Sequence, residues 1–159
     1  MKTLYLLRHG HAEDKIKQPD ISRNLHEEGK EEVKLTIENF IRQHPVPNLI
    51  ISSHANRAYQ TAEIAAKMMS YNPKNIELEN NIYYSDTEAM REALERQDDK
   101  YQSILLTGHN PTTTWFASQL NPDYKDMMPT GGLVAFEINT NSWDSLSKSE
   151  AKLLFHIYP

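Results

Sequence analysis

The stretch Leu4–Gly10 reads LYLLRHG, four apolar residues followed by an arginine, a histidine and a glycine. Unbroken apolar runs of this length are typical of strands that are buried on both faces, as in parallel sheets. We therefore expect a strand over 3–8 that ends beside His9. Because ligands of open α/β sheets bind beyond the carboxyl ends of the strands, this stretch predicts both the fold class and the place of a site.

Two later stretches repeat this arrangement of an apolar run with polar residues at its end. Residues 104–110 read ILLTGHN and put His109 after a second such strand. Residues 49–58 read LIISSHANRA and put Arg57 in the first turn of a helix that follows a short strand. The carboxyl ends of parallel strands meet at one edge of a sheet, so we expect a pocket there in which imidazole groups face an anion.

Strand-like and helix-like segments alternate along the chain. From their apolar periodicity we expect strands over 3–8, 49–51, 76–79, 102–107, 133–138 and 151–157, and helices over 26–43, 55–69, 86–97 and 112–120. This order predicts one domain over 1–159 with an α/β three-layer fold: a mainly parallel central sheet, helices on both faces and an antiparallel C-terminal edge. Ile41 and Trp115 are among the helix residues that we expect in the core.

Composition narrows the possible function classes. The chain of 159 residues has 38% hydrophobic and 25% charged residues, as is usual for a globular domain, and it has no cysteine. Disulfides, thiolate metal ligands and cysteine-based phosphatase chemistry are therefore excluded. The net charge of −5 argues against a nucleic-acid surface, and no segment is apolar for long enough to predict a signal peptide or a membrane span. We expect a cytoplasmic protein that uses no cofactor, with its oligomeric state left open.

Four residues carry the expected chemistry: His9, Arg8, Arg57 and His109. A neutral imidazole can attack phosphorus and hold the phosphoryl group covalently, provided that a neighbouring group fixes its tautomer, and this is the role expected of His9. Guanidinium groups match phosphate oxygens with two parallel hydrogen bonds, and Arg57 adds the field of a helix N-terminus. A protonated His109 would stabilise charge on the phosphoryl oxygens in the transition state.

These motifs resemble the histidine phosphatase superfamily, whose hallmark is Arg-His-Gly on the first strand. Within that superfamily the chain is most similar to the short SixA-type phosphohistidine phosphatases, from Met1 to about Leu133. Four further blocks carry the resemblance: RNLHEEG at 23–29, SSHANRAYQTA at 52–62, GHNP at 108–111 and PTGG at 129–132.

The resemblance implies a phosphoglycerate mutase-like fold and a phosphorylated His9 as the reaction intermediate. It also implies that Arg8, Arg57 and His109 complete the phosphate pocket without a metal ion. Arg23 is similar to an arginine that is common in the SixA type, which places it at the pocket rim as a substrate-binding residue.

The leaving group bears on the choice of substrate. Members that act on sugar phosphates place an acidic proton donor near the middle of the chain, where this sequence has Asp86 and Glu88 without the surrounding mutase motif. Both acids suit the first turn of a helix instead. An alkoxide leaving group needs a proton donor, whereas a protonated phosphohistidine releases a neutral ring. We therefore expect a metal-independent phosphatase acting on phosphohistidine in a protein, with a phosphotransfer domain of a bacterial signalling relay as a candidate partner.

Three other functions fit parts of the sequence. A small-molecule phosphomonoesterase of the same superfamily would differ only in its leaving group and pocket walls. A non-catalytic module could bind a phosphorylated ligand in the same pocket. His9 and His11, two residues apart at a strand end, could also begin the site of a metal-dependent hydrolase, although among later strand ends only His109 offers a further ligand.

Overall fold

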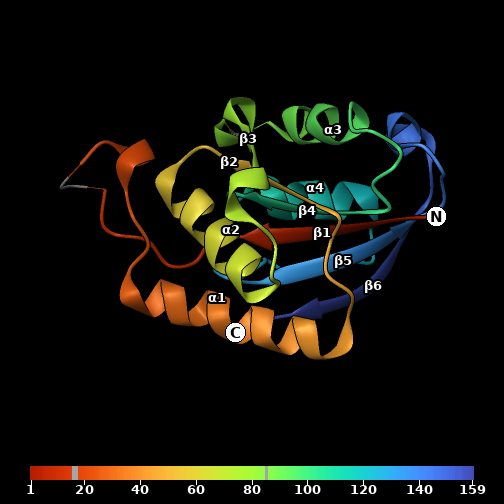
Figure 1. Cartoon of the computed structure of the whole chain (residues 1–159). Coiled ribbons are helices and arrows are strands. Elements are labelled where there is room, and N and C mark those ends of the chain that lie inside the picture. The colour runs from red at the N-terminus through yellow and green to blue at the C-terminus, as the bar shows by residue number, and fades with distance from the viewer. Residues whose placement is uncertain (16–17, 85) are drawn as a thin grey trace.

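The computed structural model describes residues 1–15, 18–84 and 86–159, and within them a six-stranded sheet forms the centre of the molecule (Figure 1). Its strands are β1 (Lys2–Arg8), β2 (Leu49–Ser53), β3 (Glu77–Glu79), β4 (Ser103–Gly108), β5 (Leu133–Ile138) and β6 (Ala151–Ile157). Their order is β3-β2-β4-β1-β5-β6. The first four strands run parallel to one another. β5 runs antiparallel to β1, and β6 runs antiparallel to β5. The predicted mainly parallel sheet with an antiparallel C-terminal edge is confirmed.

Helices cover both faces of this sheet (Figure 1). They are α1 (Glu27–Gln43), α2 (Asn56–Met68), α3 (Thr87–Glu95) and α4 (Thr112–Leu120), joined by short 3₁₀ turns at Asp20–Ser22, Pro73–Asn75, Asn80–Tyr83 and Trp143–Lys148. α1 and α2 pack on one face, and α3 and α4 pack on the other. None of the helices in the described ranges is both long and apolar enough to cross a lipid bilayer.

β1 lies between the two cores, which explains its unbroken apolar sequence. Successive side chains of a strand point to opposite faces of the sheet. Leu4 and Leu6 therefore enter the core beneath α3 and α4, while Tyr5 and Leu7 enter the core beneath α1 and α2. Because all four positions are buried, each of them needs an apolar side chain, and the strand ends where Arg8 and His9 reach the sheet edge.

Two residues that we expected in the core lie at the surface instead. Trp115 is 51% exposed and Ile41 is 37% exposed. In α4 the inner face carries polar residues, because the hydroxyl of Thr113 donates to the carbonyl of His109 and the hydroxyl of Thr114 donates to the side chain of Asn110. These local bonds satisfy buried hydroxyl groups, while Phe116 and Ala117 make the apolar contacts of α4 with the core, and Trp115 lies outside that face.

The chain after β1 packs directly on the backbone at the start of α1. A Cβ atom built on Gly10 would lie 2.5 Å from the carbonyl oxygen of Gly29, and one built on Gly29 would collide with the carbonyl oxygen of His11. The Gly10 amide also donates to the Thr61 hydroxyl on α2 at 3.1 Å. Glycine at both positions lets the two backbones approach closely, and this contact fixes the segment that carries His9.

We predict that Gly29→Ala lowers the free energy of unfolding by about 1–3 kcal/mol, because the added methyl group overpacks a rigid backbone contact. Helix propensity alone predicts the opposite sign, a gain of about 1 kcal/mol. Urea denaturation of the variant and of Glu31→Ala, an exposed change in the same helix, would decide between them. A Gly29→Ala variant as stable as the parent would show that this contact is not rigid.

Candidate active site

The structure brings the predicted site residues together at the carboxyl ends of β1, β2 and β4. Arg8, His9, Arg23, Arg57 and His109 line one pocket of about 520 Å³. The same pocket is also lined by Lys15, Asp20, Tyr83, Tyr84 and Asn110, which the sequence analysis did not single out. The pocket therefore combines two imidazoles with four cationic side chains, although the whole chain carries a net charge of −5.

His9 is held in a single tautomer by its own loop. Its Nδ1 lies 2.7 Å from the carbonyl oxygen of Gly10. Because a carbonyl oxygen only accepts hydrogen bonds, Nδ1 carries the proton and Nε2 keeps a free lone pair. Burial, together with the charges of the neighbouring arginines, lowers the pKa of His9 to about 3. His9 is therefore neutral at pH 7, which is the state that a nucleophilic imidazole requires.

His109 lies beside His9, with 5.2 Å between the ring centroids. Its Nε2 is 2.7 Å from the hydroxyl of Ser53 at the end of β2. Its Nδ1 is buried without a hydrogen-bond partner among the described residues. Burial, together with the positive charge of Arg57, lowers the pKa of His109 to about 3.

The neutral state of His109 differs from the protonated imidazole that we expected. The expected protonation of His109 considered only the effect of a bound anion on the ring. The fold surrounds the ring with apolar atoms and cations, which favour its neutral form. A phosphoryl group in the pocket would act in the opposite direction, because a nearby negative charge raises the pKa of an imidazole.

Arg8 and Arg57 are anchored by carbonyl groups from distant segments. The Nη1 of Arg8 donates to the carbonyl of Met128 at 2.8 Å. The Nη1 of Arg57, in the first turn of α2, donates to the backbone carbonyl of Asp20 at 2.8 Å. Arg57 is only 6% exposed, so its guanidinium is fixed in the pocket wall. Both guanidinium groups therefore reach the pocket in defined orientations.

Arg23 lines the same pocket, and its side chain is 13% exposed. Its Nη1 donates to the carbonyl of Glu13 at 3.0 Å, and its Nε lies 3.3 Å from the carboxylate of Asp20. Asp20 also accepts from Arg57 and from the phenol of Tyr83. Asp20 was missed by the sequence analysis, although its position three residues before Arg23 was a visible signal of an acid–base pair.

The two acids considered as proton donors lie outside this pocket. Asp86 caps α3, where its carboxylate accepts from the amide of Glu88 at 2.8 Å. Glu88 pairs with Arg91 on the outer side of the same helix. Both residues thus have the helix-terminus role that the sequence suggested.

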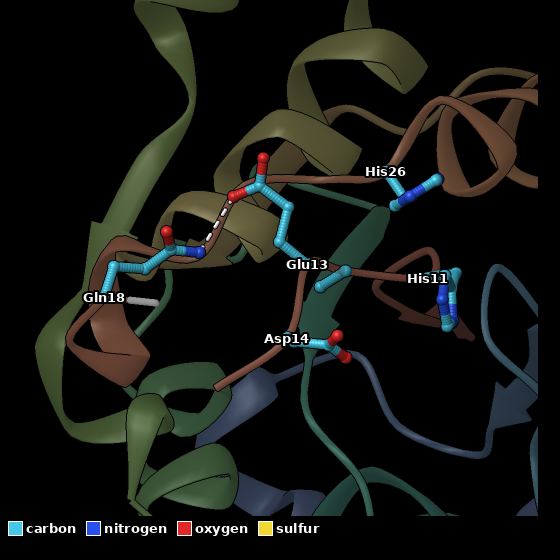
Figure 2. A pocket seen from close by; sticks show the side chains of 6 residues that line it. His11, Glu13, Asp14, Gln18 and His26 are labelled. Atoms are coloured by element: carbon cyan, nitrogen blue, oxygen red, sulfur yellow. Dashed lines mark hydrogen bonds between the residues drawn. The ribbon is translucent and has the colours of Figure 1, made fainter. Parts of the chain in front are cut away.

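His11 faces a second, separate hollow of about 370 Å³. Figure 2 shows the rings of His11 and His26 and the carboxylate of Asp14 around it, together with Glu13, whose carboxylate accepts a hydrogen bond from Gln18. His9 and His11 therefore line different pockets. Within the described ranges no three His, Asp or Glu side chains are grouped so that they could hold a metal ion.

We predict that His9 and His109 stay neutral down to about pH 5. Between a folded pKa of about 3 and the usual value of 6.5, the unfolded chain binds more protons than the folded one, so the free energy of unfolding falls as pH falls from 7 to 5. Urea titrations should show a shallower pH dependence for His109→Gln, and imidazole NMR resonances of both residues should stay flat over this range. Titration of either ring near pH 6.5 would contradict the buried, neutral pair.

Comparisons with known proteins identify the family of this chain. The family model for the histidine phosphatase superfamily (branch 1) matches residues 4–121. A comparison with curated proteins gave no match.

Solved structures with the same fold cover nearly the whole chain. A Nakamurella multipartitia protein assigned to the SixA phosphohistidine phosphatases has a TM-score of 0.86 at 18% identity, over 99% of this chain and 96% of the other. The protein histidine phosphatase SixA complexed with tungstate has a TM-score of 0.82 at 19% identity, over 98% and 96%. A mycobacterial glucosyl-3-phosphoglycerate phosphatase has a TM-score of 0.73 at 14% identity, over 99% and 98%. At such identities these structures establish the fold, and the family match establishes the rest: the chain belongs to the histidine phosphatase superfamily and is a phosphatase of that family.

Proposed function

We propose that this phosphatase transfers a phosphoryl group to His9 without a metal ion and that its substrate is a phosphohistidine side chain on a protein. One observation carries the proposal: a buried, neutral His9 presents its free Nε2 in a pocket with Arg8, Arg57 and His109. The arginines offer forked donors to phosphoryl oxygens, and His109 adds a second imidazole, whose ring centroid lies 5.2 Å from that of His9.

The first step exchanges one P–N bond for another. The substrate enters with its ring protonated on the nitrogen that does not carry phosphorus. The lone pair of His9 Nε2 forms a bond to phosphorus while the P–N bond of the substrate breaks, and that electron pair stays on the leaving ring, which departs as neutral imidazole. His9 keeps its Nδ1 proton on the Gly10 carbonyl, so the new phosphohistidine carries the same charge as the one consumed.

The second step is hydrolysis. Water attacks the phosphorus of phosphorylated His9, the P–N bond breaks, and its electron pair returns to Nε2. Both protons of the water leave with the product as H₂PO₄⁻. The neutral ring with its proton on Nδ1 is restored, and the cycle consumes one water without a proton from any carboxylic acid.

The choice of phosphohistidine rests on this proton balance. Asp86 and Glu88 lie on α3 outside the pocket, and the pocket acid Asp20 is kept ionised because its bonds from Tyr83 and Arg57 lower its pKa. An ionised carboxylate cannot protonate an alkoxide, but a protonated imidazole leaves without help. The fold shared with SixA structures supports the same substrate class, and a histidine-phosphorylated signalling domain would be the partner.

We predict that His9→Ala abolishes both turnover and the acid-labile phosphoenzyme, because the second imidazole of the pocket, that of His109, has its Nε2 hydrogen-bonded to the hydroxyl of Ser53. Arg57→Ala should lower kcat by about 10²–10³, the usual cost of losing one preorganised charge stabiliser. Arg57→Lys should recover only part of this loss, since an ammonium group lacks the fork. Rapid-quench labelling and steady-state kinetics measure these effects, and a chelator should leave the rate unchanged. Normal turnover by His9→Ala would exclude this nucleophile; a pocket that binds phosphate without any turnover would indicate a binding module.

The substrate class is tested by comparing kcat/KM at pH 7 for a phosphohistidine peptide, a phosphoserine peptide and a sugar phosphate. We expect the phosphohistidine peptide to be hydrolysed fastest, because it alone needs no proton donor. Asp86→Asn, which keeps an N-cap on α3, and Glu88→Gln serve as matched variants and should leave all three values unchanged. Faster hydrolysis of either monoester, lost in one of these variants, would identify a small-molecule phosphomonoesterase with that residue as its acid.

A further inference from the structure

In the described part of the chain, the pocket contains one carboxylate, that of Asp20. It reaches the pocket from the 3₁₀ turn Asp20–Ser22, and its side chain is 35% exposed. Its Oδ2 lies 3.1 Å from the Nη2 of Arg57 and accepts from the Tyr83 phenol at 2.6 Å. A negative charge is thus built into a site whose other charged groups are cationic.

Asp20 bonds the part of Arg57 that the proposed mechanism needs. Both terminal nitrogens of Arg57 donate to this one residue, Nη1 to its backbone carbonyl and Nη2 to its carboxylate. The side chain of Arg57 is 7% exposed, so the arginine is fixed while the acid approaches it from the solvent side. A phosphoryl group that binds Arg57 therefore shares it with a carboxylate that is already in place.

The Asp20 carboxylate is ionised at neutral pH. The hydrogen bond from Tyr83 lowers its pKa, and the charge of Arg57 lowers it further. Two anions that share one guanidinium repel each other, and the repulsion grows with the charge on the incoming group. A monoester or free phosphate brings only negative charge, whereas a protonated phosphohistidine also brings a positively charged ring that offsets part of it.

We infer that Asp20 is the specificity-determining residue of this pocket: its carboxylate competes with the phosphoryl group for Arg57 and disfavours compact dianions relative to a phosphoryl donor with a cationic leaving group. This inference rests on the proposed function and adds to it the residue that sets the preference. The same competition lowers the affinity of the pocket for product phosphate. A purely positioning role for Asp20 would have the opposite sign, because loss of the acid would then loosen Arg57 and weaken anion binding.

Asp20→Asn separates charge from position. The amide oxygen of asparagine can still accept from Arg57 and Tyr83, while the negative charge is removed. The amide nitrogen then replaces Oδ1, which lies 3.3 Å from the Nε of Arg23, so this ion pair is lost together with the charge. We expect tungstate to bind about tenfold more tightly to this variant, given a unit charge removed within a few ångströms of a partly solvated anion site. The ratio of kcat/KM for a phosphohistidine peptide to kcat/KM for p-nitrophenyl phosphate should fall by about the same factor. Removal of the Asp20 charge raises kcat/KM more for the monoester, which carries no positive charge, than for the phosphohistidine peptide.

Two further variants keep the test specific. Tyr83→Phe retains the ring and the charge of Asp20 but removes the hydrogen bond to Oδ2, so the carboxylate relies more on Arg57 and tungstate binding should not tighten. Asp123→Asn makes the same change of net charge in the exposed segment that follows the far end of α4, and it should alter neither quantity. Calorimetric titration with tungstate measures the first quantity and steady-state kinetics the second.

Unchanged or weaker tungstate binding by Asp20→Asn would overturn the inference, as would an unchanged ratio of kcat/KM values. The proposed function is judged separately, on the wild-type protein. A wild-type enzyme that prefers the monoester contradicts the phosphohistidine substrate, whereas the tungstate affinities decide on the competition at Arg57 whichever substrate is preferred.

Discussion

The hydrogen bond between the Nδ1 of His9 and the carbonyl of Gly10 determines which ring nitrogen can react, and the chemistry of the pocket depends on it. The bond is local, but its orientation requires the chain to turn directly after β1. That turn is possible because Gly10 and Gly29 let the loop and α1 touch backbone to backbone. A side chain at either glycine would push the loop away from α1 and move the nucleophile with it.

The pocket is also defined by the cost of burying charge. Burial, with the cations around the two imidazoles, keeps both rings neutral, which suits a nucleophile but leaves a strong local field for an anion. Asp20 balances part of that field through Arg57 and Tyr83. An interaction that stabilises the site without an anion therefore lowers its affinity for oxyanions. The carboxylate that neutralises Arg57 has to give up part of its interaction with the guanidinium when a phosphoryl group binds.

Much of the fold could be predicted from local sequence. β1 and β4 are buried on both faces and read as continuous apolar runs, and the glycines and prolines between segments mark where helices and strands end. The expectations for Ile41 and Trp115 were wrong because an apolar side chain does not specify which face of a helix is buried. In α4 the buried face carries Phe116 and Ala117 together with hydroxyl groups that bond the His109 carbonyl and the Asn110 side chain.

The sequence by itself determined that His9, Arg57 and His109 follow strands, because strand periodicity and helix-start signals are local properties of the chain. Only the tertiary structure decided what these residues face. Asp20 and Arg57 are 37 positions apart, and Tyr83 reaches Asp20 across 63 positions. Contacts of this kind depend on the order of the strands in the sheet and on where each loop returns to its edge. No local pattern encodes that order, so the carboxylate on Arg57 and the neutral state of His109 emerged only when the sheet brought those segments together.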